Sequence, residues 1–382
     1  MSALPPTLRA VRAAVDTRLA QVLDARRAQW ADLAPACEDL LDAAEALVSS
    51  GKRMRAVLGA VGLALGAAPE ERSRLMTGAT AVRLGAALEL YQASALVHDD
   101  VVDAAPTRRG LPAAHRRYAA QHAASGWLGD AATYGSSAAI LLGDLLMSLA
   151  GAEMGAAVAP LADSAQAAAV RDAFDAMTAE VAVGQYLDVR CQQLPPPSPD
   201  EDPREASRRM HRDALAVVRR KSARYSVMHP LLIGALQGGA APGGPLHERL
   251  SVFGEELGIA FQLRDDELGV FGDPALTGKP VGDDLREGKR TVLVALAWER
   301  ADGEGRALLR SVLARPRAGD ADIARATGLI EACGARAEHE EQIAGHLRAA
   351  VAALDPIGPA EISDESRSDL LELARLLCER RA

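Results

Sequence analysis

Residues 84–103 read LGAALELYQASALVHDDVVD, and this stretch decides the fold class of the chain. Leu84, Leu88, Tyr91 and Ala95 follow one another at steps of three or four residues, the period of a helix with one apolar face. The same steps recur near the start of the chain, at Leu8, Val11, Val15, Leu19 and Leu23. Aromatic residues make up only 3% of the chain and hairpin dipeptides are almost absent. We therefore predict an all-α fold.

Segments rich in Gly, Pro or Asp divide the chain into roughly a dozen predicted helices. These breaks fall at Gly66–Pro69, Ala104–Pro112, Leu194–Pro203, Gly238–Pro245 and Phe271–Asp284. The Pro-rich stretch 193–203 is either a linker between domains or a solvated loop within one bundle. We favour the loop, because motifs with reactive or ligand-binding side chains lie on both sides of it and must converge.

Composition excludes several classes of protein. Hydrophobic residues make up 49% of the 382 and charged residues 25%, an ordinary balance for a globular chain. The formal charge of −9 disfavours a broad nucleic-acid footprint, so no nucleic-acid partner is expected. Four scattered cysteines and an N-terminus without an unbroken apolar core favour a cytoplasmic protein. The apolar stretch 131–160 contains Asp144, so we predict a core helix and no integral membrane segment.

An acidic cluster follows the apolar stretch 84–97. Asp99 and Asp103 lie four residues apart and share one helix face with Asp100 beside them. Two bare carboxylates on one face repel each other unless a cation lies between them. Oxygen-only ligands favour Mg²⁺ over zinc or copper. Taken alone, this motif is read equally well as a solvated helix end.

Further charged clusters favour a metal site over a solvated helix end. Arg108 and Arg109 follow within one loop, and paired guanidinium groups suit the oxygens of a diphosphate. A second acidic pair, Asp265 and Asp266, ends another apolar helix. Basic residues on Gly-rich backbone occur at three more places, namely Gly51–Arg55, Gly278–Lys279 and Gly288–Arg290. Each basic cluster taken singly is read as a solvated turn, but together in an acidic protein they predict a site for Mg²⁺ and a diphosphate.

The order of these motifs from Gly51 to Thr291 resembles the trans-type isoprenyl diphosphate synthases, also called polyprenyl synthetases. The resemblance implies a large single-domain helical bundle around a deep central cavity, spanning residues 1–382. Its motif-bearing core would cover about residues 45–300, with a helical C-terminal part at 301–382. It also implies a homodimer and Mg²⁺, three ions with the diphosphate bound. The implied substrates are isopentenyl diphosphate and an allylic diphosphate, joined head to tail.

The resemblance assigns roles residue by residue. The metal-binding and catalytic aspartates would be Asp99, Asp100, Asp103, Asp265 and Asp266, with Lys221 and Lys279 also catalytic. Isopentenyl diphosphate would be bound by Gly51, Lys52, Arg55, Gln92 and Arg109. The allylic diphosphate would be held by Arg108, Gln185, Lys221, Ser222, Gln262, Lys279 and Lys289. For Gln185, a buried amide satisfied by backbone is the alternative interpretation.

One departure from the family pattern touches chemistry. Gly269 stands where the second aspartate motif usually has its last Asp. Ala56 in place of Pro and Ser222 in place of Thr are conservative by comparison. The missing carboxylate is expected to weaken one metal site.

The length of the product depends on the helix below the first aspartates. Ser94 and Ala95 are small, whereas relatives that stop at fifteen carbons resemble one another in carrying an aromatic near these positions. Tyr91 lies one helical step lower, about 4.5 Å, which is close to one isoprene unit. We predict geranylgeranyl diphosphate, with twenty carbons, as the product. An ordinary core role for Tyr91 is the competing interpretation.

Two other functions are consistent with parts of this pattern. A class I terpene cyclase also uses an aspartate-rich motif, but it has no need of Lys52, Arg55 and Arg109, and no second motif of the N-S-E type is present. A non-catalytic subunit of a heteromeric prenyl synthase would keep the fold, but such subunits tend to lose the first aspartates or their arginines.

Overall fold

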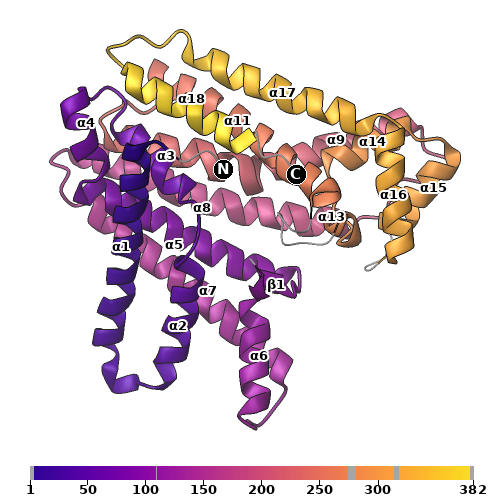
Figure 1. Ribbon diagram of the computed structural model, residues 1–382, viewed down its shortest axis with the longest axis horizontal. Helices are drawn as coiled ribbons and strands as arrows, with labels where there is room; N and C mark the ends of the chain where they lie inside the picture. The colour runs from indigo at the N-terminus through magenta and orange to yellow at the C-terminus, as the bar shows by residue number, and fades with distance from the viewer. Residues whose placement is uncertain (1–3, 109, 274–280, 314–317, 379–382) are drawn as a thin grey trace. The chain divides into compact units, whose positions relative to one another are not determined.

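The computed structural model describes residues 4–108, 110–273, 281–313 and 318–378, most of which lie in helices (Figure 1). Within these ranges the strands are the two-residue β1 (Thr107–Arg108) and β2 (Leu111–Pro112), which pair antiparallel. The all-α prediction is confirmed. Contacts divide the chain into two compact units. The single domain over 1–382 therefore stays a prediction.

The first unit comprises residues 1–175, 230–247 and 358–369. Its helices are α1 (Pro6–Gln29), the 3₁₀-helix η1 (Ala31–Leu33), α2 (Ala36–Val48), α3 (Met54–Leu63), α4 (Pro69–Met76), α5 (Ala79–Val102), α6 (Ala114–Ala124), α7 (Ala131–Val158) and α10 (His229–Gln237). Helix α5 packs against α1, α3 and α7, so the helix that carries the first acidic cluster is central to this unit.

The second unit comprises residues 176–229, 248–357 and 370–382. Helices wholly within it are α9 (Pro203–Val217), the π-helix η2 (Val218–Met228), α13 (Asp283–Arg286), α14 (Val292–Arg300), α15 (Gly303–Leu313), α16 (Asp320–Ala332) and α17 (Ala335–Leu354). Four helices have residues in both units: α10, whose first residue His229 belongs to the second unit, α8 (Ser164–Gln193), α11 (Pro245–Phe271) and α18 (Asp364–Cys378). The Pro-rich stretch 194–202 lies within the second unit between α8 and α9, as expected for a loop.

Local chemistry accounts for where the helices begin and end. Asp130 caps α7 by accepting a hydrogen bond from the Thr133 N–H at 2.7 Å, and Asp202 caps α9 in the same way. Pro6 and Pro69 occupy the first positions of α1 and α4, where the missing N–H costs nothing. The Gly- and Pro-rich breaks predicted from sequence separate helices in the structure, as far as the described residues extend.

Helix α5 corrects one prediction. The spacing of Leu84, Leu88 and Tyr91 predicts one apolar face, but residues on other sides, such as Ala86 and Leu90, are equally buried. The reason is that α1, α3 and α7 pack around this part of α5, so residues 84–91 are buried on every side. Small residues at many positions make this close enclosure possible.

Helix α7 is the one helix of the described residues that is long and apolar enough to cross a membrane by length and composition. In its most apolar window, 39% of the residues are buried. The buried stripe, which includes Leu142, Leu146 and Ala150, packs against α5 and α6. The opposite stripe is exposed.

His339 on α17 makes the stability of the protein sensitive to acid. Its side chain is fully buried, neither ring nitrogen has a hydrogen-bond partner among the described residues, and burial lowers its pKa to about 4. In the unfolded chain His339 is protonated below about pH 6.5, whereas in the folded chain it stays neutral down to about pH 4. The free energy of unfolding should therefore fall by up to about 1.4 kcal/mol per pH unit over this window.

Urea unfolding at pH 7, 6 and 5 measures this slope. The His339→Leu protein should show a shallower fall than the parent, and His247→Leu, which changes a partly exposed histidine, is the matched control. Equal slopes in the parent and His339→Leu proteins would contradict the assignment.

Candidate active site

The first acidic cluster lies at the C-terminal end of α5, in the first unit. Asp103 caps the helix, and its N–H donates to the Asp99 carbonyl at 2.8 Å. Asp99 and Asp103 are partly exposed, whereas Asp100 is only 1% exposed. The two outer carboxylates of the motif are therefore accessible, and the middle one faces the protein interior.

Arg108 on β1 forms ion pairs with this cluster. Its Nε donates to Asp100 Oδ1 at 2.8 Å, and its Nη2 lies 3.3 Å from Asp99 Oδ2. Burial raises the pKa of Asp100, and the bonds from Arg108 oppose that rise. Asp100 Oδ2 is buried and has no hydrogen-bond partner among the described residues. The guanidinium predicted to hold a diphosphate thus lies directly against the predicted metal ligands.

Helix α7 holds the end of α5 in place. His98 Nε2 lies 3.2 Å from the Ile140 carbonyl oxygen and 3.4 Å from Asp144 Oδ1. An ideal Cβ at Gly143 would overlap the His98 ring, with the Cε1 atom 2.7 Å away. A larger residue at position 143 would therefore displace the side chain that immediately precedes Asp99.

The second acidic cluster lies on α11, in the second unit. Asp266 is 7% exposed and accepts a hydrogen bond from Gln262 Nε2 at 2.8 Å. Burial and the nearby Asp284 carboxylate raise the pKa of Asp266 to about 8. Lys289 Nζ lies 3.1 Å from Asp284 Oδ1. Of the residues predicted here, Gln262 is hydrogen-bonded to Asp266, Lys289 is paired with Asp284, and Asp265 is partly exposed next to Asp266 in the chain.

Lys221 and Ser222 lie in the π-helix η2, a rare conformation that often marks functional sites. Lys221 Nζ donates to Asp188 Oδ2 on α8 at 2.6 Å, which orients the ammonium group. An ideal Cβ at Gly184 would lie 2.6 Å from the Lys221 Cα, so glycine is needed where α8 meets this helix. Gln185 follows on α8 and is partly exposed.

The basic segment 51–55 is held by a residue that sequence reasoning missed. Arg53 has a left-handed backbone and is 3% exposed. Its Nε donates to Asp16 Oδ1 at 2.7 Å, and its Nη1 lies 3.5 Å from Glu89 Oε2 on α5. Lys52 and Arg55, the predicted ligand contacts, are partly exposed on either side. Nothing in the sequence of this basic segment shows that Arg53 is buried while Lys52 and Arg55 are partly exposed.

The residues predicted to set chain length lie along α5 beneath the first cluster. Ser94 is 1% exposed, Ala95 is partly exposed and Tyr91 is 6% exposed. The Tyr91 ring meets Phe174 of α8 edge to face, with centroids 6.3 Å apart. Phe174 is a second buried aromatic that the sequence analysis did not identify. Gln92, predicted to contact isopentenyl diphosphate, is partly exposed on the same helix.

Two predicted site residues, Arg109 and Lys279, lie outside the described residues. The remaining ones fall into separate groups by unit: the aspartates of α5, Arg108 and the 51–55 segment belong to the first unit, and Gln185, η2, α11 and Lys289 belong to the second. The structure therefore brings each motif together internally with its own basic or polar partners.

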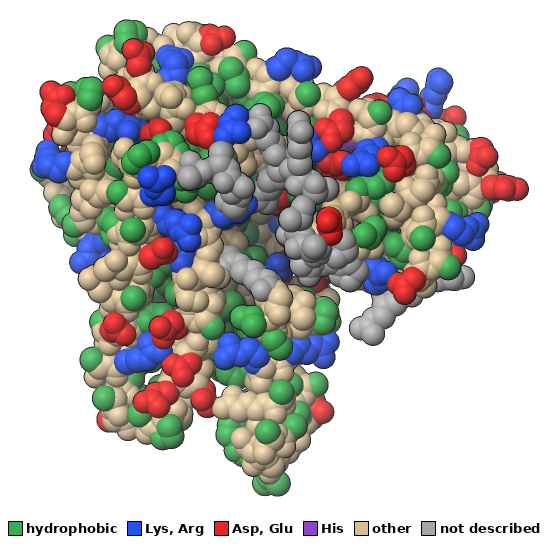
Figure 2. All heavy atoms as spheres, viewed as in Figure 1, with side chains coloured by type: hydrophobic (Ala, Val, Ile, Leu, Met, Phe, Trp, Pro, Cys, Tyr) green, Lys and Arg blue, Asp and Glu red, His purple; other side chains and the backbone are tan. Residues whose placement is uncertain are grey.

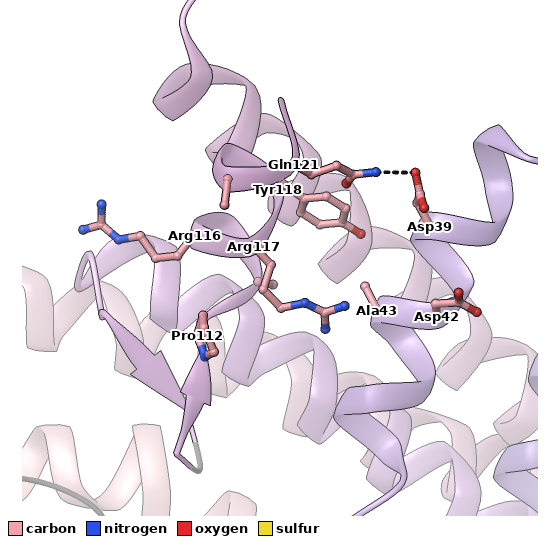
Figure 3. Close-up of a pocket in the computed structure, with 10 residues that line it drawn as sticks. Asp39, Asp42, Ala43, Pro112, Arg116, Arg117, Tyr118 and Gln121 are labelled. Carbon is pink, nitrogen blue, oxygen red and sulfur yellow. Dashed lines mark hydrogen bonds between the residues drawn. The ribbon is translucent and has the colours of Figure 1, made fainter. Parts of the chain in front are cut away.

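A pocket of about 390 Å³ lies away from these motifs, between α2 and α6 (Figure 3). Tyr118 and Arg117 line it from α6, and Gln121 reaches across to donate to Asp39 on α2. The residues that line it include none of the predicted site residues, so we do not assign it to the reaction.

The acidic clusters fit Mg²⁺ by the chemistry of their donors. Both offer carboxylate oxygens, and Asp99, Asp103 and Asp265 are partly exposed and accessible to a cation. In the described parts of the chain no group of three or more His, Cys, Asp or Glu side chains forms a complete metal site. Carboxylates carried close together on one helix suit Mg²⁺, which is commonly held by one or two carboxylates together with substrate phosphate oxygens and water.

Comparisons with known proteins agree with this chemistry. Residues 37–330 match the family described as polyprenyl synthetase. The geranylfarnesyl diphosphate synthase of Aeropyrum pernix is 33% identical over 264 residues, covering 67% of this chain and 70% of the relative. The geranylgeranyl diphosphate synthase of Mycobacterium tuberculosis is 32% identical over 302 residues, covering 78% and 74%.

A solved structure extends the similarity to nearly the full length. The geranylgeranyl pyrophosphate synthase of Corynebacterium glutamicum, complexed with isoprenyl diphosphate and magnesium, superposes with a TM-score of 0.84 at 36% identity. The match covers 97% of this chain and 99% of that chain. Since the family match spans more than half of the sequence, the chain belongs to the polyprenyl synthetase family and is a trans-prenyltransferase.

Proposed function

We propose that this prenyltransferase condenses isopentenyl diphosphate with an allylic diphosphate, head to tail and in a Mg²⁺-dependent reaction. One observation carries the proposal: each acidic cluster lies near a cation that the family resemblance assigns to diphosphate binding. Arg108 contacts Asp99 and Asp100, and Lys289 contacts Asp284 beside Asp266. Carboxylates for a metal and cations for a diphosphate are what an ionising diphosphate ester requires.

We further propose that the chain forms a single domain over residues 1–382. Support comes from the similarity to the C. glutamicum enzyme, which covers nearly the whole of both chains. Asp99, Asp103 and Asp265 would hold Mg²⁺, which supplies charge to stabilise the departing diphosphate. Asp100 is too buried to share that role equally, and its bond to Arg108 makes it the residue that orients this guanidinium.

The remaining residues bind and orient the two substrates. Lys221, held by Asp188, and Lys289 neutralise the leaving diphosphate, while Arg108 keeps its bond to Asp100 and exchanges its contact with Asp99 for phosphate oxygens. Lys52 and Arg55 bind isopentenyl diphosphate on the segment that Arg53 anchors. None of these side chains is a base for the proton that must leave the new chain, so the released diphosphate itself is the proposed acceptor.

The product proposed is geranylgeranyl diphosphate. The small side chains of Ser94 and Ala95 would let the growing chain pass, and the buried ring of Tyr91, in contact with Phe174, would stop it. The relatives named above carry two different product names, so this assignment depends on the aromatic pair and not on similarity.

Product analysis tests the function directly. Purified protein is incubated with Mg²⁺, isopentenyl diphosphate and, in separate reactions, dimethylallyl, geranyl and farnesyl diphosphates. A twenty-carbon diphosphate is expected from each starter. No elongation from any starter would favour a non-catalytic subunit, and a cyclised hydrocarbon formed without isopentenyl diphosphate would favour a cyclase.

A homodimer in the cytoplasm is also proposed. The exposed stripe of α7 carries Ile140 (45% exposed), Leu141 (61%) and Met147 (44%), and a stripe this apolar is suited to a second copy. On the face shown in Figure 2, acidic and basic side chains are interspersed, as suits a small-molecule enzyme with no nucleic-acid partner. Light scattering should give twice the 40.0 kDa chain mass, and Leu141→Glu should lower it to one chain. A monomeric parent protein would refute the dimer.

A further inference from the structure

The second acidic cluster lacks one carboxylate in its own helix. The sequence on α11 reads Asp265-Asp266-Glu267-Leu268-Gly269, so the position one helical turn beyond Asp265 has no side chain. Asp265 and residue 269 are separated by four residues and share a helix face. The corresponding first cluster has Asp103 at this position relative to Asp99.

A carboxylate from another segment fills the space beside Gly269. An ideal Cβ built on Gly269 would overlap the Oδ2 and Cγ atoms of Asp284 and would lie 3.0 Å from its Oδ1. Asp284 lies on the four-residue helix α13, in the same compact unit as this part of α11. A side chain at position 269 and the Asp284 carboxylate therefore compete for one volume.

Burial and charge distinguish Asp284 from an incidental neighbour. It is 8% exposed, its Oδ1 lies 3.1 Å from Lys289 Nζ, and its charge acts directly on Asp266. A buried carboxylate held next to another carboxylate is unfavourable unless cations compensate the pair. Lys289 supplies one positive charge, and its ammonium group also forms an ion pair with Glu287 at 2.7 Å. Among the described residues of this cluster, carboxylates outnumber cations, as suits a site that receives a divalent cation.

We propose that Asp284 supplies the third carboxylate of the second acidic cluster, in the volume that a side chain at position 269 would otherwise occupy. The inference deepens the proposed function, since it concerns the metal that the cluster would bind. Gly269 is then not a weakened site: it is the residue that makes room for a carboxylate brought in by α13. The expectation that its missing carboxylate weakens a metal site is replaced by a different source of that carboxylate.

A narrower role for Asp284 would be to hold Lys289 alone. The two roles differ in what they change. A carboxylate that contributes to the metal site alters the Mg²⁺ concentration needed for binding, whereas one that only positions a lysine alters the affinity for diphosphate at saturating Mg²⁺. Titration calorimetry of the full chain with inorganic diphosphate, at a series of Mg²⁺ concentrations, separates them.

The experiment exchanges the carboxylate between the two positions. The Mg²⁺ midpoint is the Mg²⁺ concentration at which diphosphate binding is half-maximal. Asp284→Asn keeps the side-chain volume and removes the charge, so this midpoint should rise by about 10- to 100-fold. Asp284→Ala should raise it similarly. Adding Gly269→Asp to Asp284→Ala should restore most of the affinity, because the new side chain enters the vacated volume. Adding Gly269→Asp to Asp284→Asn should not, because the amide still fills that volume.

Controls keep the test independent of folding and of catalysis. Asp283→Asn removes the adjacent carboxylate of the same helix and should leave the Mg²⁺ midpoint unchanged. Circular dichroism of each variant identifies any that fail to fold, and the Asp284→Asn result stands even if Gly269→Asp alone does not fold. Lys289→Met should weaken diphosphate binding at saturating Mg²⁺ without moving the midpoint.

Three results would overturn the inference: a parent-like midpoint in Asp284→Asn, no recovery in a folded Gly269→Asp/Asp284→Ala protein, or a parent protein that binds no Mg²⁺ with diphosphate. The elongation assay on the same preparation reports the proposed function separately. An enzyme that elongates but is indifferent to Asp284→Asn refutes only the inference. A protein that follows the exchange pattern but does not elongate refutes only the proposed function.

Discussion

An Asp99→Asn enzyme is expected to lose at least about 100- to 1000-fold in kcat/KM, the range seen when one electrostatic contact to a developing charge is removed. The side chain is partly exposed at the end of α5 and lies beside Asp103 on the same face. An amide keeps the shape but donates no charge to a metal, so the diphosphate would leave without full compensation. Initial rates with isopentenyl and farnesyl diphosphates over a range of Mg²⁺ concentrations measure the loss.

The control for this change is Asp42→Asn on α2, which removes an exposed carboxylate that pairs with Arg27. Surface pairs of this kind contribute little, so its kinetics should match the parent. Asp100→Asn makes an informative contrast. Because Asp100 is bound to Arg108, its loss should act mainly on the KM for the allylic substrate. An Asp99→Asn enzyme with more than a tenth of parental kcat/KM would remove this residue from the metal site.

Replacement of Tyr91 by Ala is expected to lengthen the product by one or more isoprene units. Tyr91 lies two turns below Asp99, about 12 Å along the helix at 1.5 Å per residue. Positions 91, 95 and 99 are four residues apart and share one face, so a chain growing from the aspartates along α5 meets the Tyr91 ring. Phe174 supports that ring, and the Tyr91→Ala/Phe174→Ala protein should give still longer chains. Mass spectrometry of the dephosphorylated products measures the lengths.

The matched control is Tyr118→Ala on α6. Tyr118 is 5% exposed, close to the 6% of Tyr91, and burial raises the pKa of each phenol to about 12. The two changes should therefore cost comparable stability through the cavity they leave, but only Tyr91→Ala should alter product length. Conversely, Ser94→Phe should shorten the product by filling the space above Tyr91. A Tyr91→Ala enzyme that makes the parental product would return Tyr91 to an ordinary core role.

Much of this protein could be predicted from local patterns. The helices, their Pro and Asp starts and the breaks between them follow from interactions within three or four residues along the chain, which the order of residues states directly. The two acidic clusters and the basic segments are likewise contiguous in sequence. Their types and spacings were sufficient to identify the family that the comparisons confirm.

Other features depend on which distant segments meet, and no local pattern encodes that. Asp188 and Lys221 are 33 residues apart, and Arg53 reaches Asp16 across 37. The burial of residues 84–91 of α5 on every side was not predicted, because helical periodicity indicates only one buried face. The role of Gly269 is the clearest case: the sequence shows only a missing carboxylate, whereas the tertiary structure places Asp284 in the vacant volume. The sequence by itself therefore determined the helices and the chemical groups, and packing decided which groups are buried, paired and brought to the same place.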